Sequence, residues 1–102
     1  LKDLVEKLGL KKSIIFLGFI SQKDLISEMN LSDIYVSCAL RDGGLASSTA
    51  EAMACERITV ISDNCDNNKW ISNDVDGFLF ENSNFKQLAE IISFILKNKL
   101  AA

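Results

Sequence analysis

The segment Asp42–Cys55 carries the residues of this chain that are best suited to bind a ligand. Two adjacent glycines, Gly43 and Gly44, follow a β-branched and aromatic stretch, Ile34–Ser37, that predicts a strand. Glycine adopts turn angles that other residues resist, and it lets a ligand approach the main chain closely. A helix that begins near Leu45–Ser47 would point its free N–H groups and the positive end of its dipole into this turn. The pattern is typical of an anion site, and phosphate fits it best.

One carboxylate, Glu51, stands in the first turns of that predicted helix. A carboxylate accepts hydrogen bonds and can take them from two neighbouring hydroxyls at once, so it suits the diol of a sugar. The same residues also fit a simple tight turn followed by a helix of small residues packed on a sheet, with Glu51 exposed. Taken alone, the residues leave both interpretations open.

Composition excludes several other kinds of site. The chain has 102 residues, is 48% hydrophobic and carries a net charge of −3, so it can bury a core but offers no basic surface for nucleic acid. It contains no histidine, which rules out a Ser–His or Cys–His catalytic pair within these residues. The three cysteines lack a C-x-x-C spacing, so we expect reduced thiols rather than a zinc site. We expect neither a signal peptide nor a membrane span, since no apolar run reaches roughly 18 residues.

The elements that must position the glycine turn alternate along the chain. Apolar segments predict strands at Ile14–Leu17, Ile34–Ser37, Ile58–Ile61 and Gly77–Phe80. Helices are predicted over Lys2–Leu8, from a cap at Ser21 to about Met29, over Ser47–Cys55, and from a cap at Ser83 to about Lys97, with a short helical turn at Lys69–Ile71. The last helix should turn Phe85, Leu88, Ile91, Ile92, Ile95 and Leu96 inward.

This alternation predicts an α/β fold, a Rossmann-like parallel sheet with helices on both faces, as a single domain over residues 1–102. Ligands of such sheets bind beyond the carboxyl ends of the strands. Gly18, Ser37–Gly44 and Asp63–Asn67 each follow a predicted strand. We therefore expect them along one ligand-binding edge of the sheet.

Four short segments also occur in a familiar order. They are Leu17–Ile20 (LGFI), Leu31–Ser37 (LSDIYVS), Ala50–Cys55 (AEAMAC) and Asp76–Phe80 (DGFLF). Together they resemble the nucleotide-sugar-binding half of retaining glycosyltransferases of the GT-B architecture, in group 1 (family 4). That family shows "flG", "l..aDv.v.pS", "EAMAcG.PvvasD" and "nGllf" in the same order. The resemblance extends from about Ser13 to Asn98, and it implies that this chain is part of a C-terminal donor-binding domain.

The resemblance assigns the ribose contact to Glu51, which matches the second glutamate of the family's E-x7-E motif. The first glutamate would fall at Gly43 and is missing here. Asp42 lies one position earlier and would reach the sugar hydroxyls only if the turn is one residue wider. Two further departures are Glu56, where the family prefers glycine, and Ile58, where proline is usual.

Other binding roles follow from the resemblance in the same way. Gly44, Leu45 and Ala46 match the turn whose backbone N–H groups face the diphosphate and the hexose. Ser47, with Ser48 beside it, would either add hydroxyl donors or cap the helix. Gly18 and the backbone of Ile20 match the strand end that packs against the nucleobase, although Gly18 also fits a plain turn.

The implied activity is transfer of a hexose from a UDP- or GDP-linked nucleoside diphosphate sugar, with retention of the anomeric configuration and without a cofactor or metal. The acceptor would be a sugar or a lipid-linked sugar, bound by an N-terminal domain, in surface polysaccharide or glycoconjugate assembly. The family's basic diphosphate clamp would lie upstream of Leu1, so we expect no catalytic residue in this chain and only weak donor binding by it alone. We expect a cytoplasmic protein, with peripheral association of the parent at the inner face of the membrane. A bare sheet edge would favour self-association.

Two alternatives stay open. A flavodoxin-like or receiver domain also alternates strands and helices, but it needs an acidic pair at one strand end and a lysine at another. Asp63 and Asp66 follow a predicted strand without such a partner cluster. A non-catalytic nucleotide- or phosphate-binding module descended from a transferase would fit the departure at Gly43. An upstream Rossmann-like domain with a basic residue would favour the transferase.

Overall fold

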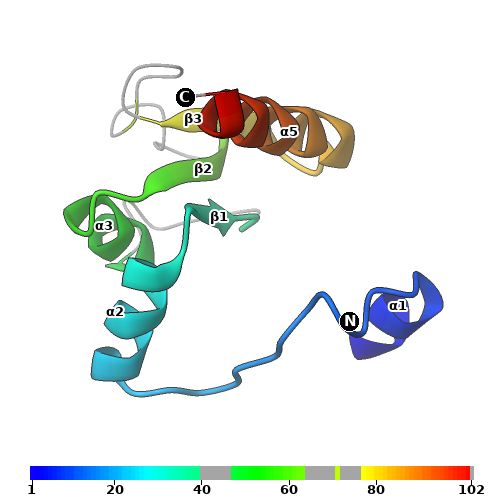
Figure 1. Ribbon diagram of the computed structural model, residues 1–102, viewed down its shortest axis with the longest axis horizontal. Helices are drawn as coiled ribbons and strands as arrows, with labels where there is room; N and C mark the ends of the chain where they lie inside the picture. Colours follow the sequence, from blue (N-terminus) through cyan, green and yellow to red (C-terminus); the bar gives the residue numbers. More distant parts are fainter. Residues whose placement is uncertain (40–46, 64–70, 72–76, 102) are drawn as a thin grey trace.

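The computed structural model describes residues 1–39, 47–63, 71 and 77–101 of the chain. Its elements, in chain order, are α1 (Lys2–Lys7), α2 (Gln22–Leu31), β1 (Ile34–Ser37), α3 (Ser47–Ala54), β2 (Ile58–Asp63), β3 (Phe78–Glu81) and α5 (Phe85–Ala101) (Figure 1). The four longer helices and the last three strands predicted from the sequence are confirmed, with ends that shift by a few residues. Within the described parts of the chain, no helix is both long enough and apolar enough to cross a membrane.

The three strands form one parallel sheet in the order β1–β2–β3. Ile34 pairs with Ile58 at one junction, and Val60 pairs with Phe78 at the other. Each strand therefore lies beside the one that follows it in the chain, and the connections step across the sheet in one direction. This arrangement confirms the predicted α/β class with a parallel sheet.

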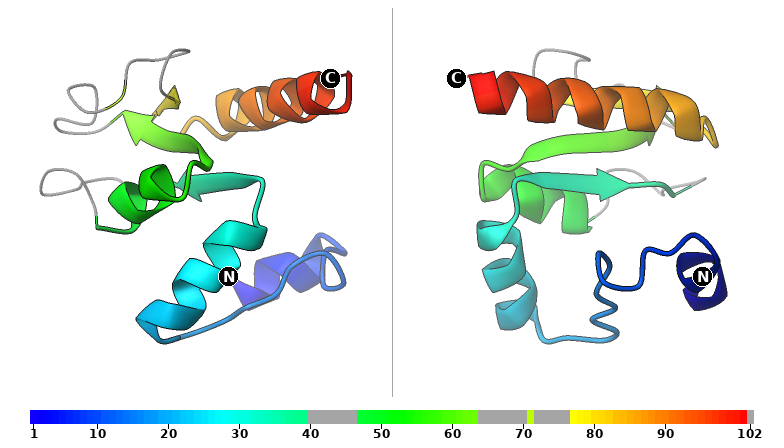
Figure 2. Two further views of the ribbon diagram at one scale, coloured as in Figure 1. Left: turned by 60° about the vertical axis from the view of Figure 1, so that its left-hand side comes forward. Right: turned by 45° about the vertical axis from the view of Figure 1, so that its right-hand side comes forward.

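The two faces of the sheet pack against different helices. Val60 and Phe80 are buried on one face, in a cluster with Ile95 of α5. Side chains alternate along a strand, so Tyr35 points to the opposite face. There its Oη lies 2.8 Å from Ser48 Oγ at the start of α3. Figure 2 shows α5 and α3 separated by the strands, which confirms the prediction of helices on both faces.

The segment Ile14–Leu17, predicted as a buried strand, forms no strand, and its side chains are exposed, Ile15 by 83%. An apolar run becomes a strand only where a neighbouring strand supplies partners for its N–H and C=O groups. None of the described strands lies beside this segment, which belongs to the link between α1 and α2 (Figure 1). The prediction of a strand here is wrong for that reason.

The predicted caps give one confirmation and one correction. Ser21 Oγ accepts a hydrogen bond from the backbone N–H of Asp24 at 3.1 Å and caps α2 as expected. At α5 the cap is Asn84 instead of Ser83, because Asn84 Oδ1 accepts from the backbone N–H of Gln87 at 3.0 Å. Ser83 occupies a left-handed turn position with φ of 64°. Asparagine caps helices at least as well as serine, so the helix begins one residue later than predicted.

The inward face of α5 is narrower than predicted. Ile95 is buried, and Leu88 and Ile91 pack around the same cluster. Phe85 is 74% exposed, because it opens the helix one turn before the part that meets the sheet. Leu96 is also exposed, since it is turned about 100° around the helix axis from Ile95. The predicted inward positions of these two residues are wrong.

Candidate functional site

The predicted ligand turn connects the carboxyl end of β1 to the N-terminus of α3. Its predicted binding residues Asp42, Gly43, Gly44, Leu45 and Ala46 lie outside the described residues, as do Lys69 and Trp70 of the predicted helical turn. The geometry of the site is therefore described from the neighbours of the turn and from Gly18, Ile20, Ser47 and Glu51.

The chain is fixed by hydrogen bonds on both sides of the turn. On the strand side, Ser62 Oγ of β2 donates to the carbonyl oxygen of Ala39. On the helix side, Tyr35 Oη lies 2.8 Å from Ser48 Oγ and 3.1 Å from Thr49 Oγ1. These contacts hold the first turn of α3 against β1. The Ser48 hydroxyl is therefore used inside the protein, whereas Ser47, the first residue of α3, is exposed.

Glu51 lies one helical turn after Ser47, on the same side of α3, because residues four apart in a helix are neighbours on its surface. The Glu51 side chain is half-buried. Its Oε1 accepts a hydrogen bond from Gln22 Nε2 of α2. Its Oε2 is buried and has no hydrogen-bond partner among the described residues. One carboxylate oxygen thus remains available for a donor that the described residues do not supply.

Gly18 and Ile20 lie at the surface just before α2. Gly18 has a positive φ of 66°, which favours glycine, and a side chain built there would meet nothing within 4 Å. Ile20 precedes Gln22 by two residues, a separation of at most about 7 Å between Cα atoms. Because Gln22 contacts Glu51, Ile20 lies two residues from a side chain that reaches α3.

The contact between Gln22 and Glu51 could not be predicted from the sequence. The two residues are 29 positions apart, and Gln22 belongs to no motif. The only local signal was the Ser21 cap, which places Gln22 at the first position of α2. Among the residues that the structure describes, no group of three or more cysteine or acidic side chains is placed to hold a metal ion.

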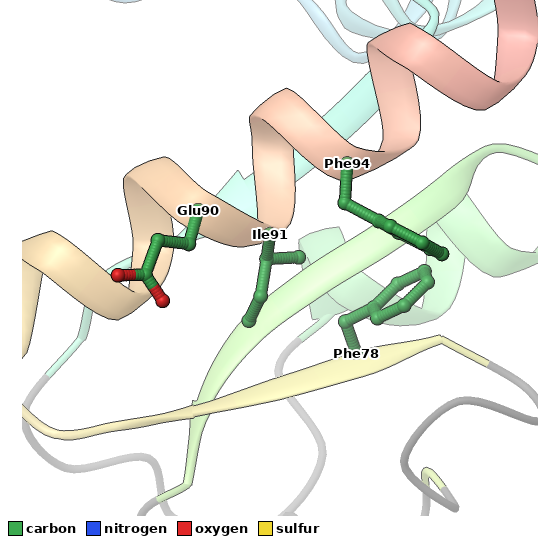
Figure 3. Close-up of a pocket in the computed structure, with 4 residues that line it drawn as sticks. All are labelled: Phe78, Glu90, Ile91 and Phe94. Atoms are coloured by element: carbon green, nitrogen blue, oxygen red, sulfur yellow. The ribbon is translucent and has the colours of Figure 1, made fainter.

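A separate groove of about 450 Å³ lies between β3 and α5, lined by Phe78, Glu90, Ile91 and Phe94 (Figure 3). The rings of Phe78 and Phe94 meet edge to face, with centroids 6.4 Å apart. The described residues of the lining are aromatic and aliphatic apart from one carboxylate, Glu90, and none of them offers a cationic side chain to an anion. These residues do not suit a phosphate, so the start of α3 is the better candidate for an anion site.

Two comparisons with known proteins indicate the same kind of protein. The family model for Glycosyl transferases group 1 matches residues 1–102. The chain is also similar to the "Putative glycosyltransferase EpsD" of Bacillus subtilis (strain 168), with 33% identity over 80 residues. That match covers 78% of this chain and 20% of the relative, so the chain spans about a fifth of the relative's length. Because the family model matches the whole chain, this protein belongs to the group 1 glycosyl transferases.

Proposed function

We propose that this chain is part of the C-terminal donor-binding domain of a retaining transferase with the GT-B architecture, and that it binds a nucleoside diphosphate sugar at the start of α3. Membership of the group 1 family supports glycosyl transfer in general. The single observation that carries the proposed site is Glu51, with one oxygen held by Gln22 and the other buried without a partner. A buried acceptor without a donor costs free energy, which a ribose hydroxyl would recover.

The diphosphate is assigned to the N-terminus of α3 and the turn before it. The first N–H groups of a helix have no partner inside the helix, and the helix dipole favours an anion there. In the transfer step these donors would stabilise the negative charge that develops on the departing diphosphate. The hydrogen bonds of Tyr35 to Ser48 and Thr49 support the assignment, because they fix the direction of these donors before a ligand arrives.

The nucleobase is assigned to the surface around Gly18 and Ile20. Both residues are exposed, and the main chain at Gly18 is open to close approach. The short distance from Ile20 to Gln22, and the contact from Gln22 to Glu51, would place base and ribose side by side. Uridine and guanosine diphosphate sugars are the proposed donors.

The acceptor is proposed to be a sugar or a lipid-linked sugar, bound by a further domain of the protein that carries this chain. Support for a further domain comes from the relative, most of which lies outside the matched part. Transfer with retention of configuration, in polysaccharide or glycoconjugate assembly, completes the proposal.

Nucleotide titration of the full-length protein tests the donor site. We expect UDP or GDP to bind in calorimetry and to shift the amide signals of Gly44, Leu45 and Ala46 in a selectively labelled sample. Shifts confined to α5 would place the ligand elsewhere. Binding of a nucleotide sugar without transfer to any acceptor would favour a non-catalytic module instead.

A further inference from the structure

We propose that Gln22 is a positioning residue, which orients the Glu51 carboxylate toward a ligand hydroxyl. The inference rests on the proposed function, since it concerns the residue that the proposal assigns to ribose. It adds a side chain from α2 to a site otherwise built from the β1–α3 connection.

The contact joins the first residue of α2 to the fifth residue of α3. Ser21 Oγ accepts from the backbone N–H of Asp24 at 3.1 Å and fixes the start of α2, where Gln22 is the first residue. Tyr35 fixes the start of α3 through Ser48, at 2.8 Å. A hydrogen bond between side chains on two helices restricts the direction of both groups, so Gln22 Nε2 determines how the carboxylate of Glu51 is turned.

The orientation has a chemical consequence at the second oxygen. A carboxylate has about four lone-pair positions, and Gln22 occupies one of them, on Oε1. The buried Oε2 then faces away from water without a partner among the described residues. Without the hydrogen bond from Gln22, the carboxylate could rotate, and water could then reach both of its oxygens. Gln22 thus keeps Oε2 of Glu51 out of contact with water and available to a hydroxyl donor of the ligand.

The type of residue at position 22 also fits this role. The amide of glutamine donates a hydrogen bond without carrying a charge. A lysine or arginine there would pair with the carboxylate and weaken its attraction for hydroxyl donors. Gln22 instead fixes the geometry of Glu51 and leaves its full negative charge for the ligand.

The test compares Gln22→Met with Lys23→Met in the full-length protein. Methionine has nearly the shape of glutamine but no donor, and Lys23 is an exposed neighbour in the same turn of α2. Affinity for UDP and GDP is measured by calorimetry, together with affinity for the 2′,3′-dideoxy form of whichever nucleotide binds. We expect Gln22→Met to weaken binding of the ribonucleotide by roughly two- to tenfold, the range for one hydrogen bond. Binding of the dideoxy form should not change, and Lys23→Met should change neither.

The outcomes separate this inference from a purely structural link between α2 and α3. Equal losses for the ribonucleotide and its dideoxy form would overturn it, and so would no loss for either. In a Glu51→Ala background, Gln22→Met should have no further effect on binding, because the group it acts through is gone. If Gln22→Met does not fold, Gln22→Glu carries the same test, with a larger loss expected from repulsion between the two carboxylates. A wild-type protein that binds neither UDP nor GDP would overturn the proposed function itself.

Discussion

The phenolic oxygen of Tyr35 in β1 lies 2.8 Å from Ser48 Oγ and so connects β1 to the start of α3. Thr49 Oγ1, at 3.1 Å from the same oxygen, is buried against the sheet. One side chain thus determines where the N-terminus of α3 lies relative to the carboxyl end of β1. The contact explains how a short helix of eight residues can present its first turn in a fixed direction.

Replacing Tyr35 by phenylalanine removes the hydrogen bonds to Ser48 and Thr49 and keeps the aromatic ring. We expect the free energy of unfolding to fall by about 1 to 2 kcal/mol, since two hydroxyls lose a partner at a part-buried position. Nucleotide affinity should fall as well, because the helix donors lose their fixed direction. Urea denaturation and calorimetry measure the two effects. Ser47→Ala is the control for stability, because Ser47 is exposed; an equal loss in both variants would contradict the role of Tyr35.

Glu51→Ala tests the proposed ribose contact. A charged hydrogen bond contributes about 1.5–3 kcal/mol, so donor affinity in the full-length protein should fall roughly tenfold to a hundredfold. Glu51→Gln should lose less, because it keeps one acceptor oxygen and the shape of the side chain. Asp42→Ala is the informative companion, since a similar loss would show that Asp42 replaces the missing first glutamate of the motif. Unchanged affinity and turnover in a folded Glu51→Ala variant would show that the assignment of Glu51 to the ribose is wrong.

Gly77→Ala should destabilise the fold strongly. A Cβ at position 77 would lie 2.4 Å from Thr59 Oγ1 and 2.8 Å from the Thr59 carbonyl oxygen, and Thr59 is fully buried in the central strand. Forcing extra volume into such a site costs about 1–3 kcal/mol. Thermal and urea unfolding measure the loss. Adding Thr59→Ala should rescue only part of it, because the carbonyl oxygen remains; complete rescue would mean that the backbone is free to move apart.

Glu56→Gly should stabilise the protein. Glu56 has a positive φ of 58° after the end of α3, in a Schellman arrangement in which its N–H donates to Met53 O and the Arg57 N–H donates to Ala52 O, both at 3.0 Å. A non-glycine residue in this left-handed position is strained, and relief should add about 1 kcal/mol to the free energy of unfolding. Glu56→Ala is the matched control and should bring no gain. Equal midpoints for the glycine and alanine variants in urea would contradict the strain argument.

Much of the fold was predictable because its signals are local. The β-branched run Ile58–Ile61 predicts a strand and Ser21 predicts the start of a helix, and the structure has both. The run Ile14–Leu17 has the same apolar character but forms no strand, because hydrophobicity reports a tendency toward burial and not the presence of a neighbouring strand. Whether an apolar run pairs is decided by tertiary structure.

The site shows the same division between local and long-range information. The motif predicted that Glu51 lies on α3, one turn from the start of the helix, and the structure confirms this position. The ligand of Glu51 stays a prediction. The contact of Glu51 with Gln22 depends on where α2 lies relative to α3, which no spacing in the sequence encodes. Glu56 is an intermediate case, because its positive φ of 58° favours the glycine that the family prefers at that position.

The hydrogen bonds on either side of the segment 40–46 also bear on how the sequence of such a protein can diverge. With Ala39 held by Ser62 and Ser48 held by Tyr35, residues that maintain stability stand outside the segment 40–46 that would meet the donor. Loops mounted on a rigid scaffold tolerate changes in sequence better than the elements that support them. If the segment 40–46 binds the donor as proposed, selection can change donor preference there while the sheet and its helices keep the protein folded. A library randomised over these positions should then yield mostly folded variants.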